Sequence, residues 1–356
     1  MKASLNFRSL VLLETENSRI VELLVADFIL AMTASTTQGK WIKLEEKGAG
    51  PGARSSHAIT IVGHKVYCFG GEFTPRVPVD NKLYVFDLNG QEWSVADAAG
   101  DVPPPRVGVT MDTVGETIYV FGGRDAEHKE LNELYSFDTT TNKWTILSSG
   151  DDGPPHRSYH SMTADDRRIF IFGGCGNAGR LNDLWGYDVV DNKWIKFSVP
   201  GENCKPRGGP GLAVVLGKIW VVYGFSGDEL DDVHYFDIAE EKWMQVETNG
   251  EKPTARSVFS TVGIGKYVFI YGGEIDPSDL GHLGAGKFSG DVYALDTETL
   301  VWKMWMDSGD HPGPRGWCAF ASGQRDGQEG MLVYGGNSPR NDRLGDIFFF
   351  TPLVET

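Results

Sequence analysis

A glycine pair that follows a short apolar run recurs along the chain and constrains its fold more than any other feature. Five segments have this form and a sixth has Tyr223 in place of the first glycine; they are residues 66–71, 118–123, 169–174, 267–273, 331–336 and 219–224. Successive copies lie 49–52 residues apart, except for a last interval of 63. A fixed period of this length predicts one repeated supersecondary unit, in which each copy packs on its neighbours.

A tryptophan after an apolar strand is the second part of the repeat. Residues 83–87 precede Trp93, and similar strands precede four further tryptophans, Trp144, Trp194, Trp243 and Trp302. The last copy, residues 346–350, has no tryptophan after it, whereas Trp41 near the start has no strand of this kind before it. We therefore expect an all-β, six-bladed kelch β-propeller, closed by pairing of the N-terminal strand around Trp41 with the C-terminal blade.

The N-terminal segment differs from the rest of the chain. We assign residues 35–356 to the propeller and residues 1–34 to an extension outside the fold. Charged residues interrupt its apolar stretch, which argues against a membrane-spanning helix and against a secretory signal; they are Glu14, Glu16, Arg19, Glu22 and Asp27. Two interpretations stay open: translation from a start codon upstream of Met32, and organelle targeting.

Charge and cysteine content narrow the partners and the compartment. With 49 acidic against 33 basic residues, the chain carries a formal charge of −16, which disfavours nucleic acid and anionic membranes as partners. The four cysteines form no CxxC pair and no zinc-ligand spacing; they are Cys68, Cys175, Cys204 and Cys318. Reduced thiols of this kind predict a cytoplasmic or nuclear protein.

One arginine per repeat follows a turn rich in proline and glycine. These arginines are Arg54, Arg106, Arg157, Arg207, Arg256 and Arg315. Because blades are related by rotation about a channel, equivalent positions should form a ring of six guanidinium groups. Such a ring could bind an anion through forked hydrogen bonds, or each arginine could pair with a carboxylate or carbonyl of the next blade. The sequence alone leaves both interpretations open.

The long interval of 63 residues signals an insertion after the fifth glycine pair. Within nine residues it brings together Glu274, Asp276, Asp279 and His282. Carboxylate oxygens and an imidazole suit Fe(II), Mn(II) or Zn(II). The alternative is a solvated acidic loop with a surface histidine.

Several strings in this chain resemble those of the plant glucosinolate specifier proteins, the epithiospecifier, nitrile-specifier and thiocyanate-forming proteins. The resemblance extends over residues 39–352 and is carried by residues 51–57, 217–225, 273–286, 293–302 and 314–317. The family's iron motif is Glu, three residues, Asp, three residues, His. This chain has Glu274 and His282 at the matching places but Ser278 at the Asp position, with Asp279 one residue later. It is also similar to the older, more general kelch relatives of that family.

The resemblance implies a function. It implies Fe(II)-dependent conversion of thiohydroximate-O-sulfate aglycones, released from glucosinolates, to nitriles or related products. Iron would be held by Glu274, Asp279 and His282, the arginine ring would bind the sulfate of a small anionic substrate in the top cavity, and Trp317 would line that cavity or pack beside it. If enzymatic, the chain would be a metal-dependent lyase acting on carbon–sulfur or sulfate-bearing small molecules. The alternative is a non-catalytic interaction module with a protein partner on its loop face.

Overall fold

The computed structural model describes residues 37–353, and the assigned extension, residues 1–34, lies outside this range. Within it the chain is strands and turns, with one 3₁₀ turn, η1 (Gly281–Leu283). Strands such as β5 (Tyr84–Asp87) alternate buried and more exposed residues, as expected for sheets packed on both faces. No helix in the described part is long and apolar enough to cross a membrane.

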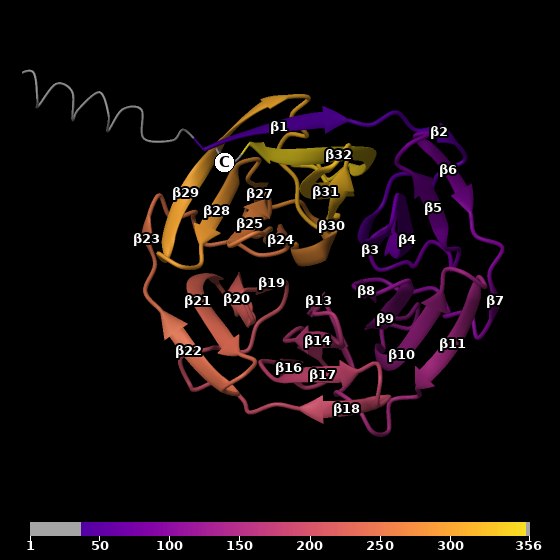
Figure 1. The fold of residues 1–356 in the computed structure, drawn as a ribbon, viewed down its shortest axis with the longest axis horizontal. Coiled ribbons are helices and arrows are strands. Elements are labelled where there is room, and N and C mark those ends of the chain that lie inside the picture. The colour runs from indigo at the N-terminus through magenta and orange to yellow at the C-terminus, as the bar shows by residue number, and fades with distance from the viewer. Residues whose placement is uncertain (1–36, 354–356) are drawn as a thin grey trace, which may run out of the picture. The chain divides into compact units, whose positions relative to one another are not determined.

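The strands form four-stranded antiparallel units, called blades here, that follow one another around a ring (Figure 1). Parallel pairing of residues 38–41 with residues 306–309 joins the last two blades into one larger sheet. Blade I is β3 (Ser55–Val62), β4 (Lys65–Glu72), β5 and β6 (Glu92–Val95); blade II is β8 (Thr110–Val114), β9 (Thr117–Arg124), β10 (Glu130–Asp138) and β11 (Lys143–Ser148); blade III is β13 (Ser161–Ala164), β14 (Arg168–Phe172), β17 (Leu184–Asp188) and β18 (Lys193–Lys196). Blade IV is β19 (Gly211–Val215), β20 (Lys218–Phe225), β21 (Glu229–Asp237) and β22 (Lys242–Val246); blade V is β24 (Ser260–Ile264), β25 (Tyr267–Tyr271), β28 (Val292–Asp296) and β29 (Val301–Gly309); blade VI is β30 (Ala319–Arg325), β31 (Gln328–Asn337), β32 (Arg343–Leu353) and β1 (Gln38–Lys43). The predicted fold class, an all-β kelch propeller, is confirmed.

Short strands add to this frame. Three of them run parallel to the outer strands β6, β11 and β29; they are β2 (Lys47–Gly48), β7 (Ala99–Gly100) and β23 (Asn249–Gly250). Others lie in the loops at the channel mouth; they are β12 (Arg157–Ser158), β15 (Cys175–Gly176), β16 (Gly179–Arg180), β26 (Glu274–Asp276) and β27 (Lys287–Phe288).

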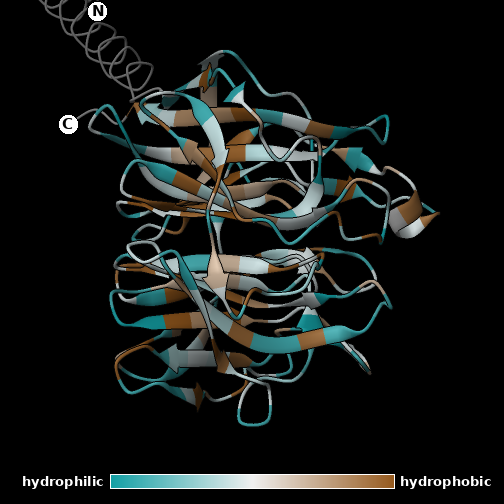
Figure 2. Ribbon diagram, turned by 90° about the vertical axis from the view of Figure 1, so that its right-hand side faces the viewer, coloured by the Kyte–Doolittle hydropathy of each residue, from teal (hydrophilic) through white to brown (hydrophobic). Residues whose placement is uncertain are grey.

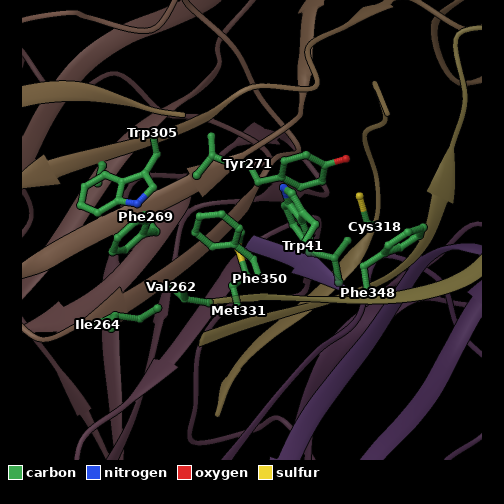
Figure 3. Packing of buried hydrophobic residues seen from close by; sticks show 13 residues of the cluster. Trp41, Val262, Ile264, Phe269, Tyr271, Trp305, Cys318, Met331, Phe348 and Phe350 are labelled. Carbon is green, nitrogen blue, oxygen red and sulfur yellow. The ribbon is translucent and has the colours of Figure 1, made fainter. Parts of the chain in front are cut away.

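The ring closes by pairing the first described strand with the last. Strand β1 is antiparallel to β32, with Trp41 opposite Phe350, so the two ends of the chain share one blade (Figure 1). The Trp41 side chain is fully buried, and Figure 3 shows it among Tyr271, Phe348 and Phe350. The indole also donates a hydrogen bond of 2.8 Å to Asp307 Oδ2. The predicted closure by the N-terminal strand is confirmed, and it leaves no free sheet edge at this blade.

Each blade contacts the next through an apolar core and through the repeated glycine pair. Trp93, Trp144 and Trp302 are buried between blades, as expected from the repeat. Gly70 has φ 75°, and a Cβ there would lie 2.8 Å from the carbonyl oxygen of Arg106 in the next blade. The next amide, that of Gly71, donates to the same oxygen at 2.9 Å. Glycine is therefore favoured at this position, where the backbone of blade I meets that of blade II. Tyr223, in place of the first glycine of blade IV, has the same left-handed backbone, with φ 57°.

Candidate functional site

A closed ring of six backbone hydrogen bonds surrounds the mouth of the central channel. Its members each lie two residues after a repeat arginine, and each amide donates to the carbonyl of the preceding member at 2.8–3.0 Å; they are Ser56, Gly108, Tyr159, Gly209, Val258 and Trp317. All six have φ between 49° and 61°. Left-handed backbone is unusual for bulky residues such as Tyr159 and Trp317, and the ring imposes it. The mouth of the channel is therefore a rigid frame.

The six repeat arginines form a buried belt beneath this ring, with 0–2% of each side chain exposed. In each blade the guanidinium donates to the carbonyl at the first position of its own glycine pair, as Arg157 does to Gly173 at 3.0 Å. Five of them also contact a carboxylate of the same blade; the pairs are Arg54–Asp80, Arg106–Glu133, Arg157–Asp183, Arg207–Asp232 and Arg315–Asp346. The predicted ring thus has its donors directed at the protein itself, within one blade and not across to the next.

Arg256 is the exception in the belt. Its hydrogen bonds go to the carbonyl of Gly272 and to the carbonyl and hydroxyl of Thr254, and no ion pair joins it to a carboxylate in the described residues. Burial lowers the pKa of Arg256 from its usual value, although nearby tyrosines and carboxylates oppose this. The charge of the belt arginine is therefore less well neutralised in blade V than in the other blades.

The channel encloses a cavity of about 390 Å³, lined by the inner strand of every blade. Trp317 lines this cavity, which is one of the two arrangements expected for its side chain. Its ring meets that of Tyr159 edge to face, with 5.4 Å between the ring centres. Two titratable groups lie deeper. Burial raises the pKa of Asp112 to about 7 and lowers that of His160 well below its usual value. The His160 Nε2 is 2.6 Å from the hydroxyl of Thr110.

Above the mouth, each blade contributes two cross-strand neighbours, which we call its rim pair. The first member directly follows the glycine pair. The second member pairs with it from the other side of the loop that follows. The rim pairs of blades I to VI are Glu72 and Pro78, Arg124 and Glu130, Cys175 and Arg180, Phe225 and Glu229, Glu274 and Phe288, and Asn337 and Arg343. The repeat is otherwise regular, but the residue types at these positions differ from blade to blade. The rim is therefore the part of the propeller in which the blades differ most.

The inserted loop of blade V carries the predicted metal residues. Glu274 is 8% exposed, and burial raises its pKa to about 7 against the opposing hydrogen bonds from the backbone amides of Gly286 and Ser278. Asp279 is exposed, and Asp276 pairs with Lys287 at 2.7 Å. The side chain of His282 lies outside the described part, so its place relative to Glu274 is not defined. Among the side chains that are described, no three acidic, histidine or cysteine residues form a metal-binding group.

Comparison of the sequence with known families and proteins identifies kelch-repeat relatives. The KLHDC2/KLHL20/DRC7 Kelch-repeats domain family matches residues 56–273. The chain is 43% identical over 342 residues, 89% of its length, to N-(sulfonatooxy)prop-2-enimidothioate sulfolyase of Thlaspi arvense, and covers 98% of that protein. It belongs to the kelch-repeat family as a relative of the glucosinolate specifier proteins. More distant relatives include Kelch domain-containing protein 3 of Bos taurus, 25% identical over 84% of this chain and 65% of that one. Acyl-CoA-binding domain-containing protein 4 of Arabidopsis thaliana is 24% identical over 92% of this chain and 50% of that one.

Several rim residues were missed from the sequence. Arg180 is exposed, forms no ion pair within the described range, and lies with its guanidinium 4.6 Å from the centre of the Phe225 ring. Arg343 reaches from blade VI to Glu72 of blade I, with 3.5 Å between Nη2 and Oε1. The signal that could have found them is the residue after each glycine pair, the position where the repeats differ most.

Proposed function

We propose that this kelch-repeat protein converts sulfated thiohydroximate aglycones, released from glucosinolates, to nitriles or related products with the help of Fe(II). The observation that carries the proposal is Glu274, a buried carboxylate whose backbone pairs with Ser257, next to the ring at the channel mouth. It stands on the inserted loop of a chain that matches almost the whole of a sulfolyase of this substrate class. Perturbed carboxyl groups near a cavity are typical of functional sites.

The donor set of the loop fits iron. Glu274, Asp279 and His282 would hold the metal, and carboxylate oxygens with one imidazole are ligands that Fe(II) accepts. Glu274 is withdrawn from water and held by two backbone amides, so its carboxylate is fixed before any metal arrives. Bound iron would supply a Lewis acid for the thiolate sulfur of the substrate. The residues of the chain bind and orient that substrate.

The sulfate of the substrate needs a cation. The belt arginines are the residues first expected to provide it, but their guanidinium groups are buried and bonded to the protein. Arg180 at the rim is exposed and held over Phe225, which leaves its donors open to a sulfate. We therefore assign anion binding to Arg180. The belt arginines instead stabilise the loops that carry the rim. Trp317 and Tyr159 form the apolar wall on which the organic part of the substrate can rest.

The test is turnover. Full-length protein is given N-(sulfonatooxy)prop-2-enimidothioate, generated in place from its glucosinolate by myrosinase, with and without Fe(II) under anaerobic conditions. We expect nitrile or a related product to form at the expense of the spontaneous isothiocyanate, only with Fe(II), and to be lost in Glu274→Gln. Glu329→Gln, an exposed glutamate of blade VI, is the matched control and should behave as wild type. Isothiocyanate alone under every condition would refute the proposal.

Exposed apolar side chains favour a second candidate function, docking of a protein partner. Four lie on the loops of blades I and V; they are Phe73 (61% exposed), Val77 (54%), Leu280 (68%) and Leu283 (56%). Figure 2 shows the turn η1, which contains Leu283, as a partly brown segment projecting from one face of the ring, at the right of the picture. Such surfaces are typical of binding sites. This candidate predicts no effect of the protein on the products of the turnover assay.

A further inference from the structure

At three junctions of the ring, the second member of a rim pair contacts the next blade. Arg343 of blade VI contacts Glu72 of blade I. Arg180 of blade III stacks on Phe225 of blade IV. Phe288 of blade V packs on Gly316 of blade VI, where an added Cβ would lie 2.8 Å from the phenylalanine ring. At these three junctions the partners are complementary, a cation with an anion, a cation with an aromatic face, and a ring with a glycine.

The junction of blades IV and V breaks this complementarity. Here Glu229, the second rim member of blade IV, lies close enough to Glu274, the first rim member of blade V, for the two carboxyl groups to act on each other electrostatically. Ser257 connects them. Its hydroxyl donates to Glu229 Oε1 at 3.1 Å, and its backbone exchanges two hydrogen bonds of 2.9–3.0 Å with that of Glu274. Residues bridged in this way carry their side chains on the same side of the pair, with Cβ atoms about 5 Å apart.

No cation of the described residues neutralises these two carboxyl groups. Glu229 Oε2 is buried and has no hydrogen-bond partner in the part of the chain that is described. Neither Glu229 nor Glu274 forms an ion pair there. Arg256 is close enough to act on Glu229 electrostatically, but its donors go to Gly272 and Thr254. An orphaned carboxylate oxygen near a second carboxylate is an arrangement that a divalent cation stabilises.

We propose that Glu229 is a metal ligand, which binds a divalent cation together with Glu274 at the junction of blades IV and V. Glu229 then supplies, from the neighbouring blade, the carboxylate that Ser278 does not provide within the loop. Ser257 positions Glu229 through its hydroxyl. The identity of the cation as Fe(II) rests on the proposed function, whereas the binding of a divalent ion between these two carboxylates does not.

The test is metal binding by calorimetry on the full chain, with Mn(II) as a probe that is stable in air and with Fe(II) under anaerobic conditions. We expect Glu229→Gln and Glu274→Gln each to weaken binding at least tenfold. Asp228→Asn removes the same charge from the exposed residue beside Glu229 and should change affinity less than twofold. Thermal unfolding without metal checks that each variant folds, and Ser257→Ala, which keeps both carboxylates, should weaken binding by a smaller factor than Glu229→Gln.

The outcomes separate this inference from the proposed function. Binding that needs Glu274 but is unchanged in Glu229→Gln overturns the inference and leaves the proposed function standing. Binding that needs both glutamates, in a protein that does not alter the products of the turnover assay, supports the inference and overturns the function. Absence of Mn(II) and Fe(II) binding in the wild-type protein overturns the inference, as does equal weakening in Asp228→Asn and Glu229→Gln.

Discussion

Trp41 of the first described strand lies directly opposite Phe350 of the last strand, with their ring centres 5.0 Å apart. This contact joins residues from the two ends of the propeller in a single apolar cluster. Because each blade is stabilised by its neighbours, opening the seam at blade VI exposes the cores on both sides of it. The stability of the whole ring should therefore depend on Trp41.

Trp41→Ala should lower the free energy of unfolding by about 3–5 kcal/mol, the usual cost of removing a buried tryptophan side chain. Urea unfolding followed by circular dichroism measures the loss. Leu353→Ala, at the exposed end of the same strand pair, is the control and should cost below about 0.5 kcal/mol. Equal small losses in both variants would show that the seam does not hold the ring closed.

Arg157→Met should destabilise the protein by about 3–5 kcal/mol. The substitution removes the guanidinium that pairs with the half-buried carboxylate of Asp183 and donates to the carbonyl of Gly173. Lys193→Met removes an exposed cation of the same blade whose partner, Asp191, is itself exposed, and should cost about 0–1 kcal/mol. Urea unfolding compares them. If Arg157 were instead a sulfate ligand, the variant would keep its stability and raise the KM for the substrate.

Asp112 should make stability depend on pH. Its folded pKa of about 7 lies above the ordinary value near 4, so between these values the folded state binds more protons and loses stability as pH rises. Asp112→Asn removes this loss, so its stability relative to wild type should improve by ~1–3 kcal/mol from pH 4 to pH 8. Unfolding of both proteins across this range tests it, and parallel curves would contradict the raised pKa of Asp112.

Trp317→Gly should be more stable than Trp317→Ala by about 1 kcal/mol, because φ at this position is 60° and glycine adopts that conformation without steric cost. Thermal unfolding compares the two. Both variants remove the ring that meets Tyr159, so both should raise the KM for the substrate by a similar factor. Equal stabilities would mean that the ring of backbone hydrogen bonds does not impose the conformation at Trp317.

The sequence predicted the fold well because its determinants are local and repeated. Gly70 and its equivalents occur where the backbones of two blades meet, in every blade but IV, which has Tyr223, so their spacing gives the repeat directly. The unmatched Trp41 located the closing strand, since a repeat unit that lacks its tryptophan needs one from elsewhere. Both features are residues at fixed positions of the repeat, and such residues can be recognised in the sequence alone.

The candidate site was less predictable because it depends on register across blades. The spacing of the arginines showed that they form a ring, but not that Arg157 would direct its donors to Gly173 and Asp183. The pairing of Glu229 with Ser257 joins residues of different blades, and no repeat position reveals it. The resemblance brought attention to Glu274, whereas the second carboxylate emerged only once the strands were aligned.

The central claim is that a metal bound at Glu274, at the channel mouth, gives this propeller its activity. Anomalous diffraction at the iron edge, from crystals grown anaerobically with Fe(II), locates that metal directly. The account predicts one strong peak within about 2.0–2.2 Å of a Glu274 carboxylate oxygen, the range usual for carboxylate–metal bonds in tetrahedral sites. Fully ordered crystals in which the peak is absent, or lies away from blade V, would contradict it.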